Sequence, residues 1–431
     1  MPATARGPYR PVQPAGGTNR CATSGNRDQA ARARRRREPG SGGQAFGPPR
    51  PDVRAGAVRG GRLSAPRQGV RRSRDRARGD GESALSGHQG ALIEDASPEL
   101  RIDPLSGHRA IIAGARAGRP GGELSAEPPQ PLDRETDPFA EGHEDRTPPE
   151  LYAVRPDGGA PNSPGWRVRV VPNLYPALKP AADGDAAQEP QPRPGANAAR
   201  DLFWAAPALG AHEVIVNAPH PVMSLAELEV EQVECAVDVW RERMRAHQDA
   251  AYVHLIVNER PEAGASLPHS HAQLYALDFV PAAVARERER FAAYATRTMG
   301  GNLLADLVQE EVRARARIIA IDEETVLMAP FGARVPYQLM IAPRVSRMRF
   351  EDPGPSGAAM IREALRRLAL RLGSSPPLNL WIRTAPRGSE QYCWRIDILP
   401  RLTYLAGLEL GAGVDLNVVA PERVAAELRD Q

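Results

Sequence analysis

Two pairs of short segments, which echo each other in order and spacing, constrain the fold of this 431-residue chain more than any other feature. The first pair is HLIVNERP, in a strand expected at YVHLIVNE, and HAQLYALDF, and the second pair, in the C-terminal half, is LNLWIRTAP and CWRIDILP. Short apolar runs of this kind are typical of strands. The sequence therefore predicts an internal duplication, in which the second copy has lost the histidines of the first.

Other segments predict further strands in both halves. They are expected at HEVIVN, ARIIAI, TVLMAP and YQLMIAPR. A half-buried strand is expected where Trp166, Val168 and Val170 alternate with polar residues. With the helices below, these strands predict an α+β fold made of two units, each an antiparallel sheet with flanking helices.

Three helices carry clear signals. Ser224 and Glu227 form the S-x-x-E pattern of a capping box. The helix that follows carries one apolar face, formed by Val230, Val233, Val237, Trp240 and Met244. Pro281 suits the first turn of a helix at PAAVARERERFAAYA, and a third helix is expected at SGAAMIREALRRLALRL.

The N-terminal segment differs from the rest of the chain in charge. Residues 1–90 contain 19 Arg and six acidic residues, a net charge of +13, whereas the whole chain carries +3. The segment is rich in Gly, Pro and Ser and lacks apolar periodicity, so we expect a disordered tail over residues 1–95. An arginine-rich arm for nucleic acid is one interpretation. An extension that only reflects a coding bias is the one we favour, because Lys occurs once, at Lys179, against 55 Arg.

Several classes of protein do not fit the sequence. The chain has no run of about 18 apolar residues and no apolar signal-peptide core, which argues against a membrane or secreted protein. Its three cysteines, Cys21, Cys235 and Cys393, are far apart and include no C-x-x-C pair, so a disulfide framework is not expected. A cytoplasmic enzyme fits best.

The segment ASLPHSHAQLYALDFVP places His269, His271 and Gln273 at alternate positions. A strand points alternate side chains to the same face, so we expect the three to form one row. Two histidines in such a row could be a pair of metal ligands. Alternatively, a neutral imidazole could attack phosphorus and form a covalent phosphoramidate, which splits one transfer into two easier steps.

From about residue 98 onward the sequence resembles the galactose-1-phosphate uridylyltransferase family, a branch of the histidine triad superfamily. The resemblance rests on segments that occur in the family's order: RIDPLSGHRAIIAGARAGRP, EDRTPPELYAVR, WRVRVVPNLYPAL, GAHEVIVNAPHPVMSL, NERPEAGASLPHSHAQ and ILPRLTYLAGLELGAGVDLNVVAPERVAAELR. It implies an N-terminal catalytic unit at residues 96–298 and a C-terminal unit without histidines at residues 299–431.

The resemblance also implies a two-step exchange through a nucleotidylated histidine. His271 matches the nucleophile, and Gln273 matches the glutamine that holds the phosphoryl oxygens without offering a titratable proton. The residues that match substrate contacts are Ser266 and the backbone of Gly264 and Ala265 at the phosphates, Arg116 and Arg119 near the nucleotide phosphates, Asn173 and Asn258 on the uridine and phosphate side, and Glu409 at a sugar hydroxyl.

Departures from the family concern its metals. The structural zinc of the family uses a C-x-x-C pair and two histidines, and here Asp137 and Ala140 stand at the cysteine positions. His220 and His269 match the two histidine ligands. Asp137, His143, His220 and His269 could complete a closed zinc site of N and O ligands, and an empty site held by hydrogen bonds is the alternative. The iron of some members cannot be built in their manner, because Glu287 matches its glutamate but no histidine follows His271.

The expected function is nucleotidyl transfer between a nucleotide sugar and a sugar 1-phosphate, with UDP-glucose and galactose 1-phosphate as the default pair. The family's members pair as dimers with residues crossing between active sites, so a homodimer is expected, without binding to membrane or nucleic acid. Two rivals stay open. One is an ADP-sugar phosphorylase or adenylyltransferase of the same superfamily, and the other is a non-catalytic nucleotide-binding protein.

Overall fold

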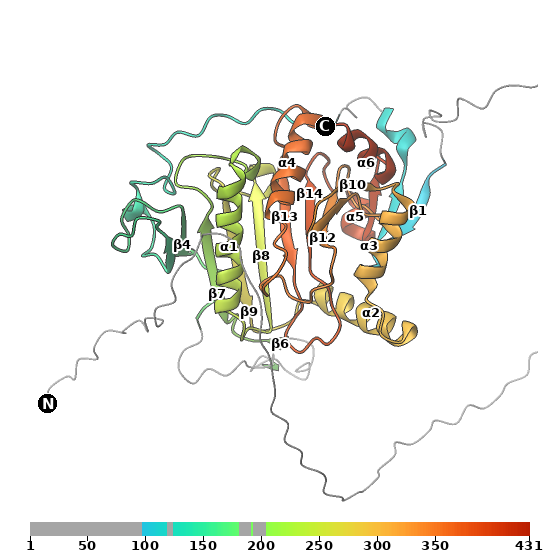
Figure 1. Ribbon diagram of the computed structural model, residues 1–431, viewed down its shortest axis with the longest axis horizontal. Helices are drawn as coiled ribbons and strands as arrows, with labels where there is room; N and C mark the ends of the chain where they lie inside the picture. The colour runs from blue at the N-terminus through green and yellow to red at the C-terminus, as the bar shows by residue number, and fades with distance from the viewer. Residues whose placement is uncertain (1–96, 119–123, 181–190, 193–203) are drawn as a thin grey trace, which may run out of the picture. The chain divides into compact units, whose positions relative to one another are not determined.

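The computed structural model describes residues 97–118, 124–180, 191–192 and 204–431 (Figure 1). All of these belong to one compact unit, Ala84–Gln431. The expected disordered tail, residues 1–95, lies outside the described residues. Residue 298, where we expected one unit to end, is the last residue of a helix in this single unit.

A ten-stranded sheet, in which every neighbouring pair is antiparallel, forms the centre of the described unit. Its order is β10 (Ile318–Ile321), β11 (Thr325–Met328), β12 (Leu339–Pro343), β14 (Arg395–Pro400), β13 (Leu378–Arg383), β8 (Tyr252–Glu259), β9 (His271–Leu277), β7 (Gly210–Val216), β4 (Val168–Pro172) and β3 (Tyr152–Val154). Five strands come from each half of the unit. They join where β8 pairs with β13, so the two predicted units share one continuous sheet.

Two smaller sheets and the helices complete the unit. The strands are β1 (Glu99–Ile102), β2 (Arg109–Ile112) and β15 (Val414–Asn417) in one sheet, and β5 (Gln191–Pro192) and β6 (Trp204–Ala205) in the other. The α-helices are α1 (Val230–Ala246), α2 (Ala282–Thr298), α3 (Leu303–Ala314), α4 (Ala358–Leu372), α5 (Gly407–Ala412) and α6 (Pro421–Arg429). The 3₁₀ helices are η1 (Gly114–Gly118), η2 (Glu144–Arg146), η3 (Leu225–Glu227) and η4 (Pro261–Ala263). None of the helices in the described ranges is long and apolar enough to cross a membrane.

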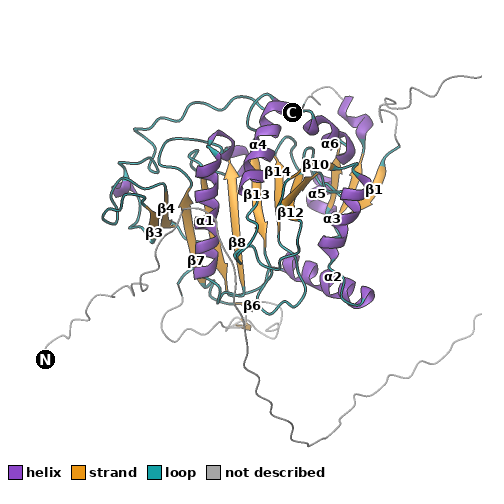
Figure 2. Ribbon diagram, in the orientation of Figure 1, coloured by secondary structure: helices purple, strands orange, loops and turns teal. Residues whose placement is uncertain are grey.

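Helices α1 and α4 lie side by side over one face of the large sheet (Figure 2). The apolar side of α1 is buried there through Val233, Val237, Trp240 and Met244, as the sequence predicted. Inward residues of the central strands, such as Leu274 on β9, complete this core. Burial of this apolar area is the main force that holds the layers together.

The opposite face of the sheet differs between the two halves. Under β10, β11 and β12 it is closed by a second apolar core, which includes Phe291 of α2 and Leu304 and Val308 of α3. In the first half a smaller cluster around Phe139, Trp166 and Val214 leaves room beside β9. The first half therefore keeps a part of its sheet available for a ligand.

The α+β prediction, with antiparallel sheets and flanking helices, is confirmed. Two local predictions were wrong. Val168 and Val170 lie in a strand that is buried on both faces rather than half-buried. Ser224 does not cap the long helix α1. Its side chain accepts a hydrogen bond from Ala226 N–H and caps the short η3 instead. The chain is extended at Leu228, before α1 begins, and the Leu228 carbonyl accepts a hydrogen bond from Arg362 of α4.

Candidate active site

Strand β9 sets the geometry of the site. It begins at His271 and pairs with β7 on one side and β8 on the other. Ala272 and Leu274 point into the core under α1 and α4. Strand alternation therefore places His271, Gln273 and Tyr275 on the opposite face.

A cavity of ≈ 420 Å³ lies against this face. A volume of this size is typical of small-molecule sites. The residues that line it come from four segments of the chain, and they include Pro138, Phe139, Arg146, Thr147, Asn173, Tyr175, Ser266, His271 and Gln273.

His271 is held as one tautomer. Its Nδ1 lies 2.7 Å from the carbonyl oxygen of His269, which can only accept, so Nδ1 carries the proton and Nε2 keeps its lone pair. The edge of the ring packs against Phe139, with ring centroids 5.3 Å apart. Burial lowers the pKa of His271, which favours the neutral, nucleophilic ring.

His269 is not part of the row that we expected. His269 lies before the first residue of β9. Between them, Ser270 N–H donates to the carbonyl of Val222, and the carbonyl of Ser270 accepts from Asn217 N–H. Its ring is buried away from the cavity, with Nδ1 2.6 Å from Asp137 Oδ2 and Nε2 2.9 Å from the carbonyl of Ala218. The side chain of His269 thus anchors the backbone whose carbonyl orients His271.

Gln273 contacts two neighbours through its oxygen. Oε1 lies 3.0 Å from the hydroxyl of Tyr275, which donates to it, and 3.1 Å from Nε2 of His212. His212 lies on β7 directly opposite Tyr275, and the two rings stack with centroids 4.1 Å apart. Gly210 allows the close pairing of β7 and β9 here, because a Cβ at that position would collide with the carbonyl oxygen of Ala276.

Asn173 and Asn258 both lie near His271. Asn173 lines the cavity, and its Oδ1 accepts from Tyr175 N–H at 2.9 Å. On β8, Ile256 pairs with Gln273, so Asn258, two residues further on, lies on the same face at the level of His271. Its Oδ1 accepts from Asn379 Nδ2 of β13 at 2.8 Å.

The loop from Arg260 to Ser266 leads toward His271. Gly264 ends η4 in the left-handed region, with φ of 89°, which favours glycine. Its N–H donates to Pro261 O, and Ala265 N–H donates to Arg260 O. Both amides therefore close the loop itself, whereas Ser266 lines the cavity.

Arg116 and Glu409 do not line the cavity of His271. Arg116 is in η1, directly after β2, and Glu409 is in α5, which packs on β15. The sheet of β2 and β15 sits beside α6 and β10, where Arg101 of β1 donates to Glu422 of α6. Strand β10 is six positions from β9 in the large sheet, or roughly 30 Å at the usual strand spacing. Arg119 lies outside the described residues.

The four residues expected at a zinc site do not form one. Within the described ranges, no group of three or more His, Cys, Asp or Glu side chains is placed to hold a metal ion. Both ring nitrogens of His269 are engaged, Nδ1 of His143 faces the carbonyl of Asp137, and His220 is exposed. The residues present thus do not fit a closed zinc centre, and a hydrogen-bonded Asp137 and His269 pair occupies the position.

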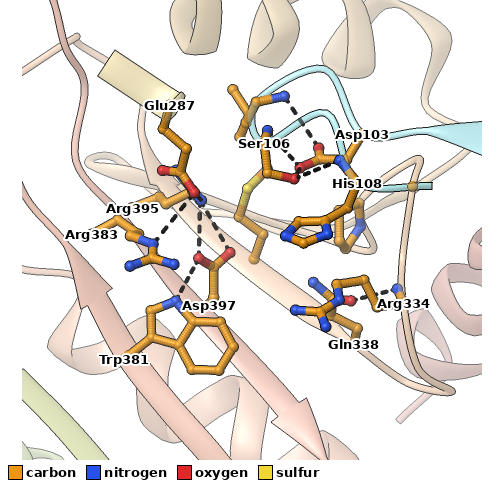
Figure 3. Close-up of a pocket in the computed structure, with 14 residues that line it drawn as sticks. Asp103, Ser106, His108, Glu287, Arg334, Gln338, Trp381, Arg383, Arg395 and Asp397 are labelled. Atoms are coloured by element: carbon orange, nitrogen blue, oxygen red, sulfur yellow. Dashed lines mark hydrogen bonds and ion pairs between the residues drawn. The ribbon is translucent and has the colours of Figure 1, made fainter. Parts of the chain in front are cut away.

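A second, smaller cavity of ≈ 50 Å³ borders the second half of the sheet (Figure 3). Beside it, Glu287 of α2 accepts two hydrogen bonds from Arg395, at 3.0 and 3.1 Å, and a third from the hydroxyl of Tyr392. Arg395 also pairs with Asp397 at 3.0 Å. The glutamate that matches an iron ligand is therefore bound by a guanidinium here.

Family models and a full-length relative match the chain. A model described as galactose-1-phosphate uridyl transferase, N-terminal domain, matches residues 93–281, and one described as a domain of unknown function (DUF4921) matches residues 209–431. The ADP-glucose phosphorylase of Arabidopsis thaliana is 30% identical over 371 residues, which cover 83% of this chain and 97% of that protein. The chain belongs to the galactose-1-phosphate uridylyltransferase family.

A further member of this family and a solved structure support the assignment. A probable galactose-1-phosphate uridylyltransferase of Drosophila melanogaster is 26% identical over 358 residues, or 79% of this chain and 97% of that protein. The crystal structure of the Arabidopsis thaliana ADP-glucose phosphorylase with bound ADP-glucose has a TM-score of 0.61 and 26% identity, and covers 78% of this chain and 99% of that one. All of these relatives are named as enzymes of nucleotide sugars or sugar phosphates, so the chain is of a nucleotidyltransferase type.

Sequence reasoning within this family missed several residues that line the cavity or contact Gln273. Phe139 lies in the segment that we considered only for metal ligands, and Arg146 and Thr147 lie in EDRTPPELYAVR, which we used only for the resemblance. Tyr275 continues the alternation of His271 and Gln273, so the period of the strand could have identified it. No signal pointed to His212, because its place depends on the register between β7 and β9.

Proposed function

We propose that this protein transfers a nucleoside monophosphate from a nucleoside diphosphate sugar to an acceptor through a covalent bond to His271. In the first step, Nε2 attacks the α-phosphorus, a P–N bond forms, and the P–O bond to the β-phosphate breaks, so that a sugar 1-phosphate leaves. In the second step, an oxygen of the acceptor attacks the same phosphorus and the P–N bond breaks. The proposal rests mainly on the hydrogen bond from His271 Nδ1 to His269 O. This bond fixes the proton on Nδ1, so the lone pair of Nε2 can serve as the nucleophile.

Neutral donors around the cavity support this chemistry. Asn173, Ser266 and Gln273 line it, and none of the three adds a negative charge that would repel phosphate. Arg146, also in the lining, contributes a positive charge. Donors that are fixed before the reaction stabilise charge on the phosphoryl oxygens without reorganising.

Two nucleotide sugars are candidates for the substrate that donates the nucleoside monophosphate. UDP-glucose with galactose 1-phosphate follows from the resemblance of the sequence to the uridylyltransferases. ADP-glucose with inorganic phosphate is favoured about as well, because the ADP-glucose phosphorylase is a relative along nearly its whole length. The cavity, at ≈ 420 Å³, has room for either base.

Labelled donors distinguish these possibilities. The full-length protein is incubated with UDP-glucose or with ADP-glucose, each labelled at the α-phosphorus, and protein-bound label is measured after gel filtration in denaturant. We expect stable label from one donor, discharged by galactose 1-phosphate or by inorganic phosphate respectively. Tight binding of both donors without covalent label would favour the non-catalytic nucleotide-binding protein.

In this proposal two copies of the chain pair, and each supplies Arg116 and Glu409 to the site of the other. Support comes from the place of the two residues within one chain, where neither of them lines the cavity of His271. The segment around Glu409 also carries exposed apolar side chains, with Tyr404 93% and Leu410 74% exposed. Such groups suit an interface between subunits.

A further inference from the structure

The protonation of His212 follows from its surroundings. The ring is mostly buried, and its Nδ1 lies 3.2 Å from the backbone N–H of Ala177, which can only donate. Nδ1 therefore accepts, and a neutral ring carries its proton on Nε2. Burial lowers the pKa of His212, which favours this neutral form near pH 7.

This tautomer fixes the orientation of Gln273. Because His212 Nε2 donates, the atom of Gln273 that faces it at 3.1 Å must be the oxygen. The hydroxyl of Tyr275 supplies a second hydrogen bond to the same oxygen at 3.0 Å. The amino group of Gln273 is then directed away from both donors, with two N–H groups for a ligand in the cavity.

Asn173 shares this arrangement. Its Oδ1 is occupied by Tyr175 N–H, and its Nδ2 lies 3.1 Å from His212 Nε2. That contact joins two donor groups, so it is no hydrogen bond in this tautomer, and the N–H groups of Asn173 also remain for a ligand.

We propose that His212 and Tyr275 are positioning residues, which hold the amide of Gln273 in the orientation that donates to phosphoryl oxygens. The inference rests on the proposed function, because it assigns a role at the same site. A flipped amide would direct Oε1 at the phosphoryl oxygens, where two acceptors repel, and its amino group at the N–H of His212. Both contacts oppose the flip, and the stacked rings hold the two donors in place.

Four variants test the role. His212→Leu removes the ring donor, and Tyr275→Phe removes the hydroxyl with little change in shape. His212→Gln restores an N–H donor within reach of Oε1. Tyr294→Phe is the matched control, since it removes a tyrosine hydrogen bond to Asp306 between α2 and α3, outside the site.

The readouts are the single-turnover rate of covalent labelling of His271, the affinity for the donor, and the ratio of donor hydrolysis to transfer. We expect His212→Leu to slow labelling by roughly tenfold or more, as loss of a positioned donor does, with a smaller effect on donor affinity. Tyr275→Phe should act in the same direction, and both should raise the share of hydrolysis. His212→Gln should recover most of the rate, and Tyr294→Phe should match the wild type.

The outcomes separate this inference from the proposed function. No labelling of the wild type by either donor would remove the proposed function and this role with it. Labelling of the wild type with equal rates and equal hydrolysis in His212→Leu and Tyr275→Phe would overturn the positioning role alone. So would a His212→Gln variant that folds like the wild type but is as slow as His212→Leu.

Discussion

Three carboxamides in or beside the cavity, Asn173, Asn258 and Gln273, have their carbonyl oxygens bound by donors of the protein. Their amino groups are left to donate. A carboxamide is symmetric in shape but not in hydrogen bonding, so its surroundings decide whether it attracts or repels an anion. At this site the surroundings select the donating orientation.

Replacement of Gln273 by His should change the partition of the reaction. A histidine would place a protonatable group beside the leaving group, so we expect Gln273→His to slow transfer and to raise hydrolysis of the nucleotide sugar. The measurement is the ratio of free nucleoside monophosphate to exchanged nucleotide sugar. An unchanged ratio would count against the argument from the carboxamide.

The sequence predicted the residues of the cavity that belong to recognisable motifs, but it did not predict how the backbone places the neighbouring side chains. His271, Gln273, Asn173 and Ser266 were named from motifs, and the structure brings them to one cavity. His269 was placed on the wrong side, because the strand begins only at His271.

Among the elements, β8 has a buried carboxyl that should make stability depend on pH. Glu259 is only 2% exposed, and its carboxyl accepts a hydrogen bond from Leu225 N–H at 2.9 Å. Burial raises its pKa from 4.5 to about 7. Between these values the folded state binds more protons than the unfolded state, so stability falls as pH rises through this window.

Glu259→Gln removes this titration and keeps an acceptor for Leu225 N–H. Relative to the variant, the wild type should lose up to about 3 kcal/mol of unfolding free energy between pH 4.5 and 8, because a pKa that differs by one between the folded and unfolded states corresponds to about 1.4 kcal/mol. Chemical unfolding of both proteins across this range measures the difference. Parallel curves for the two proteins would show that Glu259 does not titrate in this window.

Elements with a strong period were predicted well. Strand β8 has the bounds of the predicted segment YVHLIVNE, and α4 lies within SGAAMIREALRRLALRL. The helix α3 was missed, although Asn302 caps it and its apolar face is buried. The joining of β8 to β13 could not be predicted either, because pairing between distant strands depends on the packing of both halves.

At the scale of the whole molecule, the place of Arg116 and Glu409 outside the cavity of His271 predicts complementation between chains. One chain carries His271→Asn, and the other carries Arg116→Ala with Glu409→Ala. Each homodimer should be nearly inactive. After mixed refolding or co-expression, random pairing should restore about a quarter of wild-type activity, because half of the dimers then contain one complete site.

Activity of the mixture no higher than that of its components would mean that the two residues do not act across subunits. A co-expressed pair of wild type and His271→Asn, which should keep about half of the activity per chain, is the control for pairing itself.

The covalent bond to His271 is the central claim, and mass spectrometry of the labelled protein tests it most directly. The full-length chain is mixed with UDP-glucose or ADP-glucose, quenched at alkaline pH, where a phosphoramidate survives, and digested. We predict a nucleoside monophosphate on the peptide that contains ASLPHSHAQ, with fragment ions that place it on His271, and no adduct in a folded His271→Asn variant. An adduct on another residue, or transfer at the wild-type rate by His271→Asn, would contradict the account.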